Sequence, residues 1–362
     1  MIGCVQTGLM VNEVLARSVS EFLLTSKGGI NMVRKNRMRG WIVLFGLLPF
    51  FLASAASAAG PVHLRFASHV IGGTGYTQAA LMAQLLRPLL PEGSTIDVLP
   101  YSGGIGNIKL IEEGKADFGM NVTATDRWAV EGKIIFDKKY KKLRHVGLTD
   151  VFYMCVFATE KSGITSLEQA FKAKKPIRWF ALEKGATGEV ATRLLIEAYG
   201  ASSDKLKEWG GFFTNTGWVN IGPMLKDARG DIVSHGVGIA HPSMTEISLT
   251  VPGRFLDLDE PVRNALVEYG FGKADMPPNS FTKQPKTVKT IAYFMNVSAS
   301  VDVPADIVYL LTKILAEKHD ELIKGHKSFA AVTPEQSCQP GNYGAPLHPG
   351  AERYYRERGW IK

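Results

Sequence analysis

The pattern of apolar positions predicts a strand, a glycine-rich turn and a helix over residues 64–90. Residues 64–67 form the strand, and residues 72–75 (GGTG) form the turn. The apolar positions of the helix recur at the spacing of one helical face, at Leu81, Leu85, Leu86 and Leu89. Similar units follow strands predicted over residues 95–99 and 177–182. We therefore expect an α/β fold organised around three such units.

Each of these turns ends where a helix begins, which suits the binding of a small anion. The second turn contains Gly103 and Gly104, and the third covers residues 184–188 (KGATG). The first N–H groups of a helix have no partner within it and lie at the positive end of its dipole. Glycine lets such donors approach a ligand closely. The turns match neither G-x-G-x-x-G nor G-x-x-x-x-G-K-[ST], so they do not predict a nucleotide site.

Two long strands, residues 146–159 and 290–299, are predicted to pair with each other. Two such strands between α/β halves supply a hinge, because a few residues at their ends absorb the rotation of one half on the other. We expect residues 60–156 with 291–362 to form one lobe and residues 157–290 the other.

Polar residues also stand at two other predicted element ends. Thr123, Thr125 and Asp126 follow a strand predicted over residues 117–122. In open α/β sheets, ligands bind outside the carboxyl ends of the strands. In the second lobe, Ser243 and Glu246 lie three residues apart and predict a capping box at the start of a helix.

Residues 1–59 have the pattern of a secretory leader and of an extension upstream of it. Four basic residues lie between positions 34 and 39, an apolar run covers residues 41–52, and Ala56-Ser57-Ala58 forms an A-x-A site. We predict cleavage after Ala58 or Ala59. An uncleaved anchor is the alternative, because residues 41–59 are 19 apolar or small residues, close to the ~20 that span a bilayer. Translation that starts at Met32 would exclude residues 1–31.

Composition limits the partners of the exported chain. Its 362 residues and 45% hydrophobic content suffice for two cores. Of 42 Lys and Arg and 34 Asp and Glu, six and two lie in residues 1–59, which leaves a net charge of +4. That charge, without basic runs interleaved with aromatics, predicts no nucleic-acid partner. Cys155 and Cys338 could pair or stay buried thiols, and the Cys and His spacing predicts no metal site and no cofactor.

The candidate loops supply hydroxyls and amides rather than a catalytic set. Neither G-x-S-x-G nor H-E-x-x-H occurs in the sequence. Ser102, Thr123, Thr125 and Thr187 are suited to holding a ligand, so we predict a binding protein that is not an enzyme. One alternative is a secreted hydrolase or transferase that uses Ser102 or His241. A second is a sensor domain that presents its closed lobes to a membrane receptor.

Short motifs that span nearly the whole region after the leader carry a family resemblance. They are Gly72-Gly73-Thr74, Gly103-Gly104 with Asn107, Thr125-Asp126, residues 185–188 with the helix end at 194–200, and the closing residues 347–355 (LHPGAERYY). The chain resembles the TAXI-family substrate-binding proteins of tripartite ATP-independent periplasmic (TRAP) transporters. The resemblance implies a type II periplasmic-binding-protein fold, a periplasmic location, and delivery of a solute to a TRAP-type membrane permease driven by an ion gradient.

Three single positions and one three-residue stretch depart from the family pattern. Gly75, Ile105 and Ala124 stand where an aromatic residue, a serine and a glutamine are usual, and residues 186–188 (ATG) stand in place of Ser-Gly-Thr. Three of these changes remove bulk or hydrogen-bonding groups, so the solute need not be the glutamate or 2-oxoglutarate associated with the family. We still expect a small organic anion with a carboxylate, because the backbone donors remain.

Both lobes are expected to contribute to the binding site. The predicted contact residues are Gly73, Thr74, Gly75, Tyr76, Ser102, Gly104, Asn107, Thr123, Thr125, Thr187, Gly188 and Ser243. Tyr76 would form an aromatic wall or belong to the core, and Asn107 would orient the solute or cap its helix. Ser243 would clamp the solute or only cap a helix. Arg65, Arg127 and Arg178 are further residues that could reach the cleft and bind a carboxylate.

Overall fold

The computed structural model describes residues 60–362 except Val70, Ser102 and Gly185. The predicted leader and upstream extension, residues 1–59, lie outside the described residues. A ten-stranded sheet runs through the described part in the order β2-β1-β3-β10-β4-β7-β5-β6, with β8 paired to β4 and β9 paired to β10. Its strands are β1 (His63–Ala67), β2 (Thr95–Leu99), β3 (Phe118–Val122), β4 (Leu143–Thr159), β5 (Arg178–Ala181), β6 (Phe212–Asn215), β7 (Ile232–Val237), β8 (Gly253–Phe255), β9 (Gly272–Met276) and β10 (Val288–Ser300).

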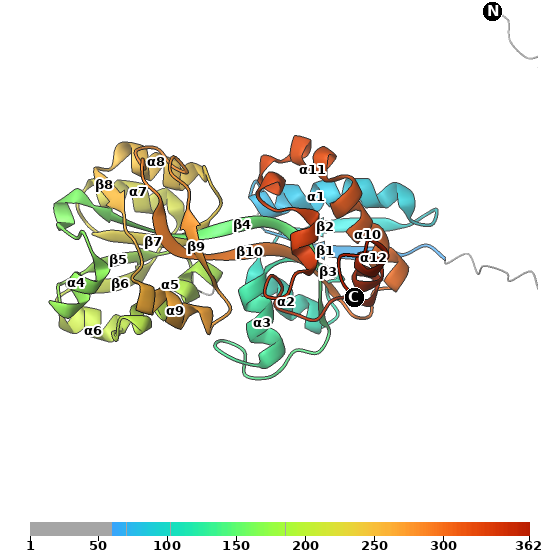
Figure 1. Ribbon diagram of the computed structural model, residues 1–362, viewed down its shortest axis with the longest axis horizontal. Helices are drawn as coiled ribbons and strands as arrows, with labels where there is room; N and C mark the ends of the chain where they lie inside the picture. Colours follow the sequence, from blue (N-terminus) through green and yellow to red (C-terminus); the bar gives the residue numbers. More distant parts are fainter. Residues whose placement is uncertain (1–59, 70, 102, 185) are drawn as a thin grey trace, which may run out of the picture. The chain divides into compact units, whose positions relative to one another are not determined.

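Helices pack around the two ends of this sheet and form two lobes (Figure 1). Lobe 1 contains β1 to β3 with α1 (Thr74–Leu86), α2 (Gly104–Glu112), α3 (Thr123–Glu131), α10 (Ala305–Glu317), α11 (His319–Gly325) and α12 (Pro349–Glu357). Lobe 2 contains β5 to β9 with α4 (Leu167–Lys172), α5 (Thr187–Ala198), α6 (Ser203–Glu208), α7 (Trp218–Lys226), α8 (Pro242–Thr250) and α9 (Glu260–Val267). The two-lobed α/β fold predicted from the sequence is confirmed. The residues at which one lobe ends and the other begins stay a prediction.

The two lobes repeat one strand arrangement. In lobe 1, β1 pairs in parallel with β2 and β3, and β10 runs antiparallel to β3. In lobe 2, β5 pairs in parallel with β6 and β7, and β4 runs antiparallel to β7. Parallel strands need crossover connections, so a helix follows each of them. The carboxyl ends of the parallel strands therefore lie at the starts of helices in both lobes.

Strands β4 and β10 cross between the lobes and pair with each other, as the sequence predicted (Figure 1). Their antiparallel register includes Ala292 opposite Tyr153 and Ser300 opposite Leu143. The register shifts between Met295 and Asn296 and again between Val297 and Ser298. Such irregularities bend a strand and increase its local twist.

A hydrophobic cluster extends from lobe 1 into lobe 2 through Trp128 of α3. The Trp128 and Phe271 rings meet edge to face, with centroids 5.9 Å apart. The indole N–H of Trp128 donates to the Tyr269 carbonyl at 2.7 Å. Buried indoles usually need such a polar partner. The helix that carries Trp128 was not predicted from the sequence, which placed Thr123, Thr125 and Asp126 at the carboxyl end of a strand.

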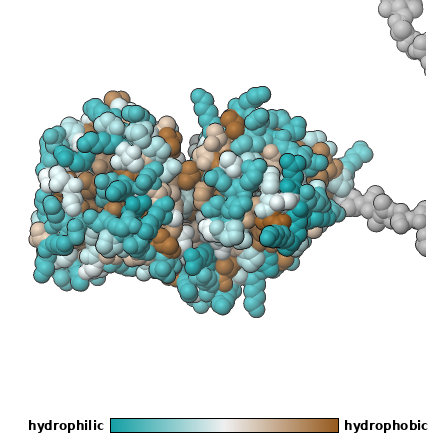
Figure 2. Space-filling view, in the orientation of Figure 1, coloured by the Kyte–Doolittle hydropathy of each residue, from teal (hydrophilic) through white to brown (hydrophobic). Residues whose placement is uncertain are grey.

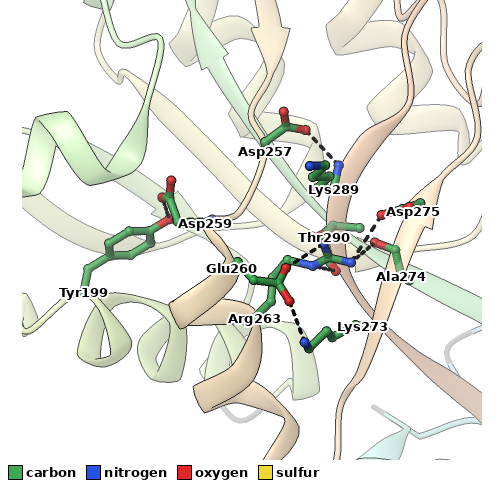
Figure 3. Close-up of polar contacts among 10 residues, drawn as sticks. All are labelled: Tyr199, Asp257, Asp259, Glu260, Arg263, Lys273, Ala274, Asp275, Lys289 and Thr290. Atoms are coloured by element: carbon green, nitrogen blue, oxygen red, sulfur yellow. Dashed lines mark hydrogen bonds and ion pairs between the residues drawn. The ribbon is translucent and has the colours of Figure 1, made fainter.

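A polar cluster around Arg263 fixes α9 against β9 and β10 (Figure 3). The Arg263 side chain is 9% exposed. Its Nε donates to the Thr290 carbonyl at 2.9 Å, and Nη2 donates to the Ala274 carbonyl at 3.1 Å. Glu260 and Asp275 accept from the same guanidinium at 3.2 Å each. Because these partners belong to the protein itself, the cluster is structural.

Both described cysteines are free and buried. Cys155 lies in β4, with its Sγ 3.7 Å from the Met276 sulfur. Cys338 lies at the end of a 3₁₀ helix in lobe 1. The alternative of two buried thiols, left open by the sequence, is therefore the one that the structure shows.

Candidate functional site

The helix starts at the carboxyl ends of the parallel strands form the candidate site. In lobe 1, α1, α2 and α3 follow β1, β2 and β3, and in lobe 2, α5, α7 and α8 follow β5, β6 and β7. In these two sets, the residues before α1, α2 and α7 are Gly73, Gly103 and Gly217. Helix starts carry unpaired backbone N–H groups and partial positive charge. In Figure 2, apolar and near-neutral surface gathers at the waist between the lobes.

Two of these helix starts face each other across the lobes. A Cβ placed on Gly104, the first residue of α2, would lie 3.0 Å from the Thr187 hydroxyl oxygen. Thr187 is the first residue of α5 and is 9% exposed. Gly104 has φ of +44°, in the left-handed region that favours glycine. The sequence prediction that turns from both halves meet at one place is therefore supported by a direct approach of Gly104 and Thr187.

The imidazole of His69 lies between the first helix starts of lobe 1. A Cβ on Gly75 would lie 2.8 Å from the ring, and a Cβ on Gly103 would lie 2.6 Å from Nε2. Glycine is required at both positions because the ring fills the space that a side chain would need. Burial lowers the pKa of His69 to about 4, although a hydrogen bond with the Met120 backbone opposes the shift. His69 is thus neutral at pH 7, and its Nε2 has no partner among the described residues.

His235 has the matching position in lobe 2. A Cβ on Gly188, the second residue of α5, would overlap its ring. Burial lowers the pKa of His235 to about 3, and proximity to His241 adds to the shift. The His235 ring meets the indole of Trp218 edge to face at 5.7 Å, and His241 packs on the same indole at 5.1 Å.

These contacts define a continuous band, which we call the cleft band. It runs through Gly75, His69, Gly103, Gly104, Thr187, Gly188, His235, Trp218 and His241. Four of these residues, Gly75, Gly104, Thr187 and Gly188, were predicted as contacts from the sequence. His69, Gly103, Trp218 and His235 were not predicted as contacts. His241 was considered as a catalytic residue of the alternative enzyme. Only His69 offered a local signal, because it lies between a predicted strand and a glycine turn.

Several predicted contact residues have partners within the protein. Asn107 is fully buried, and its Nδ2 lies within 3.3 Å of the carbonyls of Ala67, Ser68 and Met120. This places Asn107 as a link between α2, β1 and β3. Its Oδ1 has no partner among the described residues. A ligand contact for Asn107 stays a prediction.

Thr123 and Thr125 of α3 also form hydrogen bonds within the protein. Thr125 donates to the Val122 carbonyl at 2.8 Å, and Thr123 accepts from the Phe294 N–H at 3.3 Å. Gly344 lies so close to α3 that a Cβ on it would overlap the Thr123 carbonyl. Both threonines stay predicted contacts, although their hydroxyls already hold α3 in place.

Two further predicted residues lie at the edges of helices. Tyr76 in the first turn of α1 lines a groove of about 650 Å³ between α1 and β2, together with Gln84, Arg87 and Asp97. Thr74 is the first residue of α1, after Gly73. Contacts of Tyr76 and Thr74 with the solute stay predictions.

The capping box predicted at Ser243 is wrong. The residue before α8 is His241, and its side chain makes no cap hydrogen bond. Pro242 occupies the first helical position, which it favours because its fixed φ suits a helix start and its missing N–H costs nothing there. Ser243 is therefore inside the helix, and its proposed clamp on the solute stays a prediction. Ser102, another predicted contact, lies outside the described residues.

A model of the NMT1-like family matches residues 66–359. The chain belongs to the NMT1-like family. Solved structures similar to it include MatC from Rhodopseudomonas palustris with bound malate, at 13% identity and TM-score 0.48, covering 83% of this chain and 98% of that chain. An adipate-bound protein of R. palustris has 16% identity and TM-score 0.48, covering 83% and 97%. A TctC solute-binding protein from Polaromonas has 12% identity and TM-score 0.47, covering 83% and 98%.

Two arginines considered for the cleft of this NMT1-like protein are held elsewhere. Arg65 in β1 forms two hydrogen bonds of 3.0 Å to Asp117, which precedes β3. Arg178 in β5 pairs with Asp231, which precedes β7, at 2.7 Å. Both pairs lie toward the amino ends of parallel strands, opposite the helix starts. The matching positions show that the two lobes use the same ion pair to join neighbouring strands.

The third arginine lies beside a smaller pocket of about 210 Å³. Arg127 lines this pocket with Thr123, Gly270 and Tyr343, and it pairs with Glu131 at 3.1 Å.

In the described ranges of this NMT1-like protein, no group of three or more His, Cys, Asp or Glu side chains is arranged to hold a metal ion. No described helix is long and apolar enough to cross a bilayer.

Proposed function

We propose that this NMT1-like protein is a periplasmic receptor that binds a small organic carboxylate between its lobes and delivers it to a TRAP-type membrane permease. The observation that carries the proposal is the approach of Gly104 to Thr187, which brings the start of α2 against the start of α5. Two helix starts that face one another provide unpaired N–H donors from both lobes to one anionic group.

The energy of binding must come mainly from hydrogen bonds inside a closed cleft. A dissociation constant of about 1 μM corresponds to roughly −8.2 kcal/mol. A single helix end contributes only about 0.3–1 kcal/mol toward an exposed charge. Hydrogen bonds to a charged group contribute more, about 1.5–3 kcal/mol each. The solute therefore has to be desolvated between the lobes rather than attracted to one helix end.

Titration calorimetry on the chain without its leader tests this function. We expect at least one member of a panel of carboxylates (glutamate, 2-oxoglutarate, malate, adipate and aromatic acids) to bind. Replacing Thr74 and Thr187 together with valine should abolish that binding and leave the melting temperature of the ligand-free protein nearly unchanged. Thr250→Val is the matched control, because Thr250 is an exposed residue of α8 whose hydroxyl bonds within its own helix. Full affinity in the double variant would refute the site.

Location and partner need separate tests. A periplasmic receptor should appear in the osmotic-shock fraction with residues 1–59 removed. Genes for a small and a large permease subunit beside this gene, and ion-gradient-dependent uptake that requires this protein in vesicles containing those subunits, would support TRAP-type delivery. Turnover of an ester or phosphoester would instead favour the hydrolase alternative.

A further inference from the structure

Three polar atoms of lobe 2 are shut off from solvent without a hydrogen-bond partner among the described residues. They are His235 Nδ1, His241 Nδ1 and Thr245 Oγ1. Buried polar groups in folded proteins are normally paired, either directly or through water. His235 Nδ1 is covered by Gly188, on which a Cβ would overlap it. His241 Nδ1 and Thr245 Oγ1, at the start of α8, are therefore the two polar groups that a ligand would satisfy.

Trp218 joins two of these groups into one surface. Its indole contacts the edge of His235 at an interplanar angle of 88° and lies at 39° to the ring of His241. Trp218 is the first residue of α7 and is only partly buried. One flat aromatic ring therefore stands beside hydrogen-bonding nitrogens, an arrangement that suits a planar ligand group with a polar substituent.

This surface is continuous with the proposed anion site. His235 packs on Gly188, which follows Thr187, and Thr187 approaches Gly104 of lobe 1. A ligand whose carboxylate lies at the helix starts of α2 and α5 would thus extend its other end toward His235 and Trp218.

The buried imidazoles beside Trp218 offer no positive charge to a second carboxylate. His235 and His241 are both neutral at pH 7, because burial lowers the pKa of each. Glu183 and Lys184 are the charged residues beside the start of α7, and a Cβ on Gly217 would lie 3.1 Å from Glu183 Oε1. Both side chains are exposed, where water screens their opposite charges.

We propose that Trp218, His235 and His241 form a specificity subsite, and that the solute is a monocarboxylate with a planar, hydrogen-bonding ring rather than a dicarboxylate. The inference rests on the proposed receptor function, because it takes the carboxylate to bind at the two facing helix starts. The ring packs on the indole of Trp218, and its polar substituent pairs with the unpaired His241 Nδ1.

Calorimetry with 4-hydroxybenzoate, benzoate and succinate tests the subsite on the full chain without its leader. We expect the protein to bind 4-hydroxybenzoate at least about ten-fold more tightly than succinate. Trp218→Leu should lower the affinity for both aromatic acids by about ten-fold and change succinate binding by less than about three-fold. Ligand-induced quenching of tryptophan fluorescence should disappear in this variant.

Two further variants distinguish loss of the subsite from a general loss of folding or binding. Trp209→Leu is the matched control, because Trp209 lies in lobe 2 and packs on Phe171, outside the cleft band. It should keep the preference for aromatic acids. His241→Gln should weaken 4-hydroxybenzoate and leave benzoate unchanged, because only the first carries a polar ring substituent.

The outcomes distinguish this inference from the receptor function. Succinate that binds as tightly as the aromatic acids, and that still depends on Thr74 and Thr187, would overturn the subsite and leave the receptor standing. An unchanged preference in Trp218→Leu would also overturn the subsite. Failure of every carboxylate to bind would overturn the receptor itself.

Discussion

The Ser298 hydroxyl donates a 2.5 Å hydrogen bond to Asp126 Oδ2, which joins the first turns of α3 to the crossing strand β10. Asn296 Nδ2 donates to the same oxygen at 2.8 Å. Asp126 is completely buried, and this burial raises its pKa to about 7 despite the two hydrogen bonds. The carboxyl group is therefore protonated in the folded protein well above the pH at which it would ionise in the unfolded chain.

Replacing Asp126 with asparagine should flatten the pH dependence of stability. Between about pH 4 and pH 7 the folded state keeps the Asp126 proton and the unfolded state loses it, so this group's contribution to the unfolding free energy falls as pH rises. Asp126→Asn has no such proton and should be the more stable form at pH 7.5, by about 1–3 kcal/mol. Urea unfolding from pH 4.5 to 7.5 measures the difference.

The charge-loss control is Asp227→Asn, at an exposed position after α7. It should leave the slope of stability against pH unchanged. Asp150, whose pKa burial also raises to about 7, will keep part of the dependence in every variant. Parallel curves for the wild type and Asp126→Asn would contradict the prediction.

Gly104→Ala should weaken ligand binding by about ten-fold. The new methyl group would lie 3.0 Å from the Thr187 hydroxyl, so the helix starts of the two lobes would be pushed apart. Strain at φ of +44° also lowers the unfolding free energy, by about 1–2 kcal/mol. Gly114→Ala supplies the control, because Gly114 has φ of +68° with nothing within 4 Å of its Cβ position. Both variants should lose similar stability, and equal affinities in calorimetry would show that the Gly104 contact is unimportant.

Arg263→Met should destabilise the protein by about 2–4 kcal/mol. The substitution leaves the Thr290 and Ala274 carbonyls of β10 and β9 without their buried donor. Lys172→Met, which removes an exposed pair with Glu168, should change stability by no more than about 0.5 kcal/mol. Denaturant unfolding measures both. A small effect at Arg263 would mean that water or a rearranged side chain replaces the guanidinium.

A reductant should leave the melting temperature unchanged, because Cys155 and Cys338 are separate buried thiols. Burial raises the pKa of both groups, which reduces their reactivity further. A thiol reagent should label the chain from residue 60 onward slowly in the native state and at two sites after unfolding. A melting temperature lowered by reductant would indicate a disulfide.

Strands β1 to β5 and β10 could be predicted because local signals mark them, whereas β6, β9, α4, α6, α9 and α11 were not predicted. The glycine turns before α1, α2 and α5 and the two long alternating strands were all found in the sequence. Helix α3 was missed because it follows β3 directly, with no glycine turn between Val122 and Thr123. The capping error at Ser243 arose because the effect of Pro242 one position earlier was overlooked.

Only the helix starts of the candidate site could be predicted from the sequence; the side chains packed against them could not. Gly104 and Thr187 could be assigned because their turns indicate helix starts. His69 was missed although it stands beside a glycine turn, because nothing in the sequence shows that its ring fills the space at Gly75 and Gly103. His235 had no local signal, because its role depends on a glycine distant in sequence. Gly188 contacts the ring of His235, which lies in β7, and no spacing rule connects these positions. The neutrality of both imidazoles likewise follows from burial that only the folded chain provides.

The position of β10 between β3 and β4 has a consequence for the order in which the strands can pair as the chain emerges from its amino end. Until residues 288–300 emerge, β3 has no partner on that side, and β4 can pair only with β7 and β8. The β7-β5-β6 portion is complete after residue 237, about 50 residues before β10 begins. The amino-terminal strands therefore keep an open edge until β10 pairs, and this edge is the part of the unfinished sheet most exposed to pairing with other chains.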